Sequence, residues 1–116
     1  MIGLPVVALS VMVDQVKSGK GFIIKTNGDV APFNPTVEDN GNMVYDLNAV
    51  RSACNFDYVE IARLRDDIIL LCDEEGLCKA NPVVNLLATK LYQNAYKTNE
   101  VGIIGDCVIC HTKAVN

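Results

Sequence analysis

The sequence predicts an α+β fold, a mostly antiparallel sheet of about five strands with two helices packed on one face. Short runs rich in β-branched residues recur along the chain, and such residues favour strands. Asn27-Gly28 stands between two of these runs, and Asn-Gly is a strong signal for a β-hairpin turn. Only two segments carry clear helix signals, so strands interrupted by helices indicate α+β rather than a doubly wound parallel sheet.

The first twenty residues are predicted to be an N-terminal extension, and residues 21–116 a single α+β domain. Within the extension, residues 5–13 read PVVALSVMV, which fits a strand by β-branched content and a helix by length, so both remain open. Residues 22–26 and 30–33 are predicted to form the hairpin. Pro32 places the second strand at an edge, because proline donates no ladder hydrogen bond. The polar segment from Asn34 to Asn42 is predicted to be a loop.

A short helix is predicted from Asp46 to Arg51, with the Asp46 carboxylate as N-cap. Residues 58–62 and 68–72 are predicted strands, and the second is apolar throughout, as expected for a strand buried on both faces. Asn81-Pro82 predicts the start of the second helix, which runs to about residue 94 or 96. Residues 101–110 are the last predicted strand, in which Gly102 and Gly105 indicate a bulge or a close backbone approach.

Composition excludes several classes of protein. Ten basic residues stand against fourteen acidic ones, which argues against a nucleic-acid partner bound through its phosphates. Half of the residues are apolar and 21% are charged, which argues against disorder. The apolar segment at residues 1–13 is shorter than a membrane span and follows no basic residue, so no membrane association is expected. A cytoplasmic location with reduced thiols is therefore predicted.

The five cysteines are not predicted to bind a cofactor. Cys54 and Cys72 are expected to be small buried hydrophobes. Cys107-Val108-Ile109-Cys110-His111 matches the haem attachment signature, and with Cys72 or Cys78 it could also supply zinc ligands. In a strand, however, Cys107 and Cys110 face opposite sides of the sheet. No metal and no cofactor are therefore predicted.

Two surfaces are candidates for binding. A free helix N-terminus favours an anion, so a small, nucleotide-like ligand is expected there; the predicted ligand-binding residues are Lys79, Asn81, Asn85, Thr89, Arg63 and Arg65. Tyr92 and Tyr96 stand four apart on the same helix and form a predicted protein-contact pair. The acidic run Asp73-Glu74-Glu75 is interpreted as a solvated turn, with a metal-dependent hydrolase as the alternative. No catalytic residue is predicted.

The second half carries a pattern typical of one small family. An apolar strand runs into Asp73-Glu74-Glu75-Gly76 and is followed by Lys79, Asn81-Pro82, Asn85, Ala88-Thr89 and Gly102-Ile103-Ile104-Gly105. Upstream, Ile24-Lys25, Gly28, Pro35 and Val59-Glu60-Ile61 fit the same pattern. Over about residues 21–108 the chain resembles domain-of-unknown-function family 3846.

The resemblance implies a small protein encoded by a bacteriophage, another large DNA virus or a mobile element, with no known catalytic set. The expected function is that of a non-enzymatic viral accessory protein in the host cytosol, which binds a host protein or a small host ligand. Inhibition of a host defence by occlusion or sequestration is the most concrete form. A self-assembling structural subunit, hence a homo-oligomer, is the remaining alternative.

Overall fold

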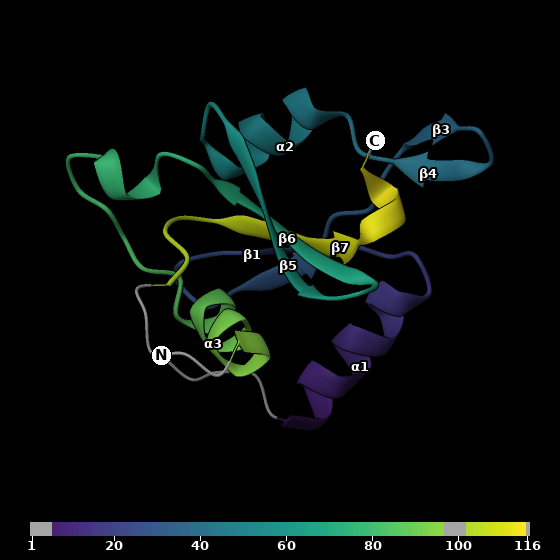
Figure 1. The fold of residues 1–116 in the computed structure, drawn as a ribbon, viewed down its shortest axis with the longest axis horizontal. Helices are drawn as coiled ribbons and strands as arrows, with labels where there is room; N and C mark the ends of the chain where they lie inside the picture. The colour runs from purple at the N-terminus through teal and green to yellow at the C-terminus, as the bar shows by residue number, and fades with distance from the viewer. Residues whose placement is uncertain (1–5, 97–101, 116) are drawn as a thin grey trace.

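The computed structural model describes residues 6–96 and 102–115, and it confirms the α+β class. A five-stranded antiparallel sheet has the order β2-β1-β7-β6-β5, and a separate hairpin pairs β3 with β4 (Figure 1). The strands are β1 (Phe22–Ile24), β2 (Val30–Pro32), β3 (Val37–Asp39), β4 (Asn42–Val44), β5 (Val59–Arg65), β6 (Ile68–Asp73) and β7 (Cys107–His111). The helices are α1 (Val6–Lys17), α2 (Leu47–Cys54) and α3 (Leu86–Tyr96), with short 3₁₀ turns η1 (Gly76–Cys78) and η2 (Thr112–Ala114).

Strand β7 is the centre of the sheet. Val108 pairs with Ile23 of β1 on one side and with Leu71 of β6 on the other, so two hairpins flank β7. Ile68 to Cys72 are all buried, as the apolar run predicts. Pro32 lies on the edge strand β2, also as predicted. No helix in the described part of the chain is long and apolar enough to cross a bilayer.

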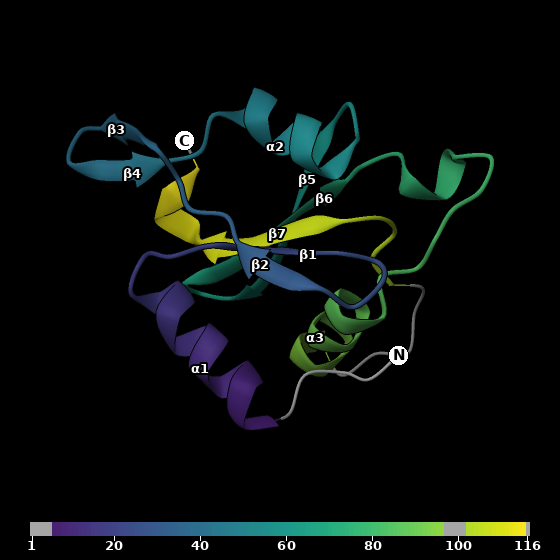
Figure 2. The same ribbon diagram turned by 180° about the vertical axis from the view of Figure 1, so that it is seen from behind.

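Helices cover both faces of the sheet. Two helices share one face, but they are α1 and α3, which pack with Ile24, Leu70 and Ile109. Helix α2 lies on the opposite face, where Val50 packs with Val108 (Figures 1 and 2). The two helices expected together from the sequence therefore lie on opposite sides. Helical periodicity shows which side of a helix is apolar but not which face of the sheet it covers.

The N-terminal segment, for which the sequence allows either a strand or a helix, forms helix α1. Met12 and Val16 are buried in the same core cluster as the sheet residues. The predicted division between an extension at 1–20 and a domain at 21–116 therefore does not coincide with a break in packing. Gly19 ends the segment with a φ of 108°, which L side chains rarely adopt.

The two Asn-Gly pairs both form hairpin turns. Asn27-Gly28 joins β1 to β2 as predicted, with Gly28 at a φ of 96°. The prediction of a loop over residues 34–42 was wrong, because β3 and the start of β4 lie there. Asn40 and Gly41 both have positive φ, which is the requirement of a type I′ turn.

Helix α3 begins at Leu86, so the predicted start at Asn81-Pro82 was wrong. Val84 instead forms an isolated antiparallel bridge with Ile104. The side-chain oxygen of Asn85 accepts the backbone N–H of Ala88 at 3.1 Å, and Asn85 thus caps the helix. The close approach predicted at Gly102 is confirmed, because a Cβ there would lie 2.1 Å from the Thr89 side chain.

Candidate functional site

The predicted ligand residues Lys79 and Asn81 line one cleft of about 210 Å³. Lys79 Nζ lies 2.7 Å from Asp73 Oδ2 and donates to the Asn55 carbonyl at 3.1 Å. The Asp73 side chain is only 4% exposed, so this ion pair is sheltered on its acidic side. Asp106 lines the same cleft. The predicted cation is therefore already paired, and the cleft offers no excess positive charge to an anion.

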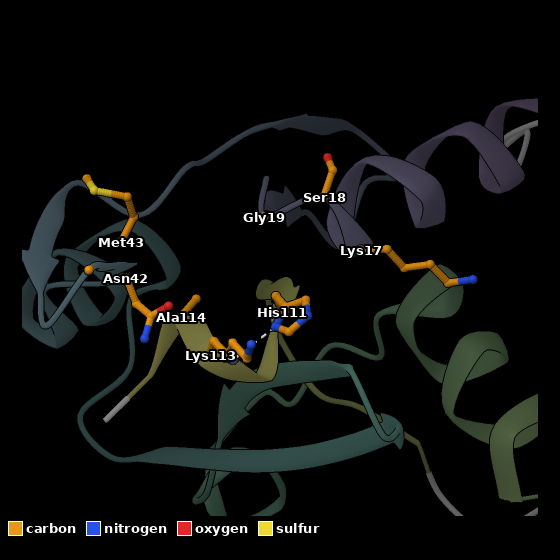
Figure 3. A pocket seen from close by; sticks show the side chains of 9 residues that line it. Lys17, Ser18, Gly19, Asn42, Met43, His111, Lys113 and Ala114 are labelled. Carbon is orange, nitrogen blue, oxygen red and sulfur yellow. Dashed lines mark hydrogen bonds between the residues drawn. The ribbon is translucent and has the colours of Figure 1, made fainter.

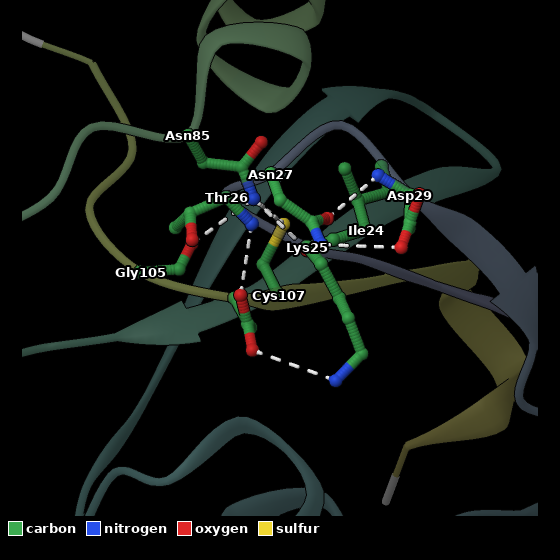
Figure 4. Close-up of polar contacts among 9 residues, drawn as sticks. Ile24, Lys25, Thr26, Asn27, Asp29, Asn85, Gly105 and Cys107 are labelled. Carbon is green, nitrogen blue, oxygen red and sulfur yellow. Dashed lines mark hydrogen bonds and ion pairs between the residues drawn. The ribbon is translucent and has the colours of Figure 1, made fainter.

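Asn85 and Thr89 are buried and fully used within the fold. Asn85 Nδ2 donates to the carbonyls of Ile24 at 2.9 Å and Gly105 at 3.0 Å (Figure 4). Thr89 Oγ1 accepts the backbone N–H of Ile103 at 2.9 Å. Both side chains fasten α3 to the segment that leads into β7. These two polar side chains therefore have a structural role. Because their partners lie far away in the chain, the sequence alone did not show that they are buried.

Arg63 and Arg65 lie on the edge strand β5, at the opposite end of the β5–β6 hairpin from Asp73. Arg63 donates to the Asp66 carbonyl at 3.3 Å, and the Arg65 guanidinium lies 3.4 Å from Asp67 Oδ1. The structure therefore does not bring the two arginines to Lys79 and Asn81, and the six predicted ligand residues do not share one site.

Tyr92 and Tyr96 contact each other, with ring centroids 4.8 Å apart and planes tilted by 40°. Their role as a protein-contact pair stays a prediction. The Tyr96 hydroxyl donates to the Arg63 carbonyl, so the pair also joins α3 to β5. Tyr92 further lines a pocket of about 200 Å³ together with Glu60, Asp73, Glu74 and Leu77, here called the acidic pocket.

The segment from η1 to the first residue of α3 exposes apolar side chains, and one of them, Leu77, also lines the acidic pocket. Four of them expose between 40% and 66% of their surface; they are Leu77, Val83, Val84 and Leu86, here called the apolar loop surface. The predicted helix that starts at Asn81-Pro82 includes Val83 and Leu86, so the sequence analysis missed this surface. The signal that could have found it is the pair of adjacent valines, which fits an extended segment better than a helix.

The cysteines and the histidine do not form a metal centre. Cys107 packs on one face of the sheet and Cys110 on the other, as strand alternation predicts. Burial raises the pKa of the Cys54, Cys72 and Cys110 thiols to about 12 and that of Cys107 well above its ordinary value. No three His, Cys, Asp or Glu side chains of the described residues lie close enough together to hold a metal ion.

Comparison of the chain with protein-family models, curated proteins and solved structures finds no match. The resemblance to the family of unknown function therefore stays a prediction.

Proposed function

We propose that this chain is a non-enzymatic binding protein that docks a partner protein on the apolar loop surface. Exposed apolar side chains that gather on one loop are typical of protein contact sites. The observation that carries the proposal is Leu77, which is 66% exposed at the rim of the acidic pocket. A large apolar side chain beside a cavity can anchor a partner, because the partner gains both contact and burial.

The acidic pocket defines the chemistry of that partner. Glu60 and Glu74 form no ion pair within the described residues, whereas the charge of Asp73 is balanced by Lys79. An arginine or lysine of the partner fits this pocket, since its aliphatic stem can lie against Leu77 and the Tyr92 ring while its head group meets a carboxylate. The net charge of −4 also steers a basic surface toward this chain.

The partner is thus a protein with an apolar patch and a basic side chain next to it. A host protein, and inhibition of a host defence by occlusion, follow from the family resemblance and are part of the proposal, as is a cytosolic location. The hydrolase alternative rests on Asp73, Glu74 and Glu75. The Asp73 carboxylate already contacts Lys79 and accepts the backbone N–H of Glu75, and these contacts favour the binding role in our proposal.

Affinity capture from a bacterial host lysate, read by mass spectrometry, tests the proposal. We expect wild-type protein to retain one partner that Leu77→Asp loses and that Glu74→Gln weakens. Val37→Asp is the matched control, because Val37 is 45% exposed on the separate β3–β4 hairpin. Equal capture by wild type and Leu77→Asp contradicts the proposal. Light scattering on the purified protein shows whether the partner is a second copy of the chain, which would support the structural-subunit alternative.

A further inference from the structure

A further cavity lies away from the acidic pocket and the apolar loop surface. It has a volume of about 380 Å³ and lies between the end of α1, the β3–β4 turn and η2. Three segments far apart in the sequence therefore meet around one hollow (Figure 3). We propose that this cavity, here called the basic pocket, binds a small phosphate monoester. The inference is independent of the proposed protein contact.

Charge is the first argument. Lys17, His111 and Lys113 line the basic pocket, and no acidic residue does, although the chain as a whole is acidic. Ion pairs in the described part of the chain engage Lys25, Arg65 and Lys79 but neither Lys17 nor Lys113. The Glu38 carboxylate accepts the N–H of the lining residue Gly41 at 3.2 Å on the hairpin side. The two unpaired ammonium groups therefore favour an anion in this hollow.

His111 supplies a ring nitrogen next to these charges. Its Nδ1 accepts the backbone N–H of Lys113 at 3.1 Å. A nitrogen that accepts a hydrogen bond carries the lone pair, so in the neutral ring the proton is assigned to Nε2. Nε2–H makes no hydrogen bond within the described residues and is left to donate to a ligand. Backbone and ring geometry thus fix which nitrogen faces an incoming oxygen.

The remaining lining indicates the kind of anion. Figure 3 shows His111 between the end of α1 and the hairpin, with Lys113 beside it and the Lys17 ammonium directed away from the imidazole. Lys113 and His111 are therefore the expected direct contacts, and Lys17 contributes through its charge. On the other walls, the Asn42 amide and the Ser18 hydroxyl can bond ligand hydroxyl groups, since Ser18 Oγ donates to the Gln15 carbonyl and keeps its acceptor capacity.

Size sets the limit on the ligand. Pockets for small molecules span roughly 300–1,000 Å³, and this one lies near the lower end. It suits one phosphate on a sugar-sized body better than a dinucleotide. Phosphate fits this donor set because its oxygens accept from ammonium and N–H groups at once, and such charge-assisted hydrogen bonds are strong.

Titration with ribose 5-phosphate, with ribose as the neutral probe, tests the proposal by calorimetry. We expect ribose 5-phosphate to bind, ribose not to bind, and Lys113→Gln to weaken binding by about tenfold or more. Lys90→Gln is the matched control, since it removes the same charge from the exposed side of α3, and we expect less than a twofold effect. No binding up to about 10 mM overturns the proposal. So does equal weakening by both variants, because the effect would then come from net charge.

A second measurement does not depend on any variant. His111 is the single histidine of the chain, so its imidazole nitrogens give unambiguous NMR signals. In the free protein we expect the tautomer with the proton on Nε2, and addition of ribose 5-phosphate should shift the Nε2 signal. Observation of the Nδ1–H tautomer, or of an Nε2 signal that saturating ribose 5-phosphate leaves unchanged, contradicts the proposed contact.

Discussion

Replacement of Asn85 by alanine tests how firmly one buried side chain joins α3 to the sheet. Asn85 is 1% exposed and makes three hydrogen bonds at 2.9–3.1 Å: two donated to the carbonyls of Ile24 and Gly105, and one accepted from the Ala88 N–H. Alanine removes all three bonds. It leaves two carbonyl groups and one N–H without these partners in an interior that excludes solvent.

The expected loss of stability follows from these contacts. A typical hydrogen bond contributes ~1 kcal/mol net, and a buried group left unsatisfied costs ~1–3 kcal/mol. Some of the three backbone groups will find other hydrogen-bond partners in the variant. We therefore expect the free energy of unfolding to fall by about 3–5 kcal/mol. Domains of this size are stable by ~5–15 kcal/mol. The Asn85→Ala protein should therefore still fold but unfold at much lower denaturant concentration.

Urea unfolding followed by circular dichroism measures this loss. Asn81→Ala is the control, because Asn81 is exposed and its replacement should change stability by no more than ~0.5 kcal/mol. The Asn85→Asp variant separates the loss of hydrogen bonds from the formation of a cavity. Aspartate has nearly the same size and still accepts the Ala88 N–H, but it places an oxygen where the amide donated to the Ile24 and Gly105 carbonyls. The reasoning is refuted if Asn85→Ala loses less than ~1 kcal/mol, or if the nearly isosteric aspartate variant is as stable as wild type.

Three further predictions concern the thiols and one glycine. Brief alkylation at pH 8 should modify the exposed Cys78 alone in the native protein and all five cysteines in urea, and mass spectrometry counts the adducts. Burial raises the pKa of the Cys54, Cys72 and Cys110 thiols from about 9 to about 12. Above pH 9 the unfolded chain therefore releases protons that the folded chain retains, so stability should fall as the pH rises from 9 to 12. Thermal unfolding measured at each pH tests this. Gly102→Ala should cost ~1–3 kcal/mol, because its Cβ would lie 2.1 Å from the Thr89 side chain, and an unchanged melting temperature would contradict that clash.

The sequence predicted those parts of the fold that depend on residues close together in the chain. Asp46 caps α2 because its carboxylate accepts the Asn48 N–H at 2.9 Å, a contact within three residues of the chain. The apolar run in β6 is buried on both faces because every residue in it is apolar. These features need no knowledge of distant partners, and the sequence is sufficient to find them.

Features set by distant partners were not predictable in the same way. Asn81-Pro82 has the local chemistry of a helix start, yet the bridge between Val84 and Ile104 keeps that segment extended. The true cap, Asn85, has its other bonds to segments 20 and 61 residues away. The predicted ligand residues do not lie together for the same reason, since the register of the β5–β6 hairpin places Arg63 far from Lys79.

The order of the strands has a consequence for how the chain folds during synthesis. Strand β7 follows the other strands of this sheet in the chain, and it joins the β1–β2 hairpin to the β5–β6 hairpin. Until it emerges, each hairpin has an open edge and neither can complete the sheet. Non-local strand pairing of this kind slows folding and leaves edges that can pair wrongly. A ribosome-bound chain that stops before Cys107 should therefore remain protease-sensitive and chaperone-bound, and a chain extended through β7 should become protease-resistant.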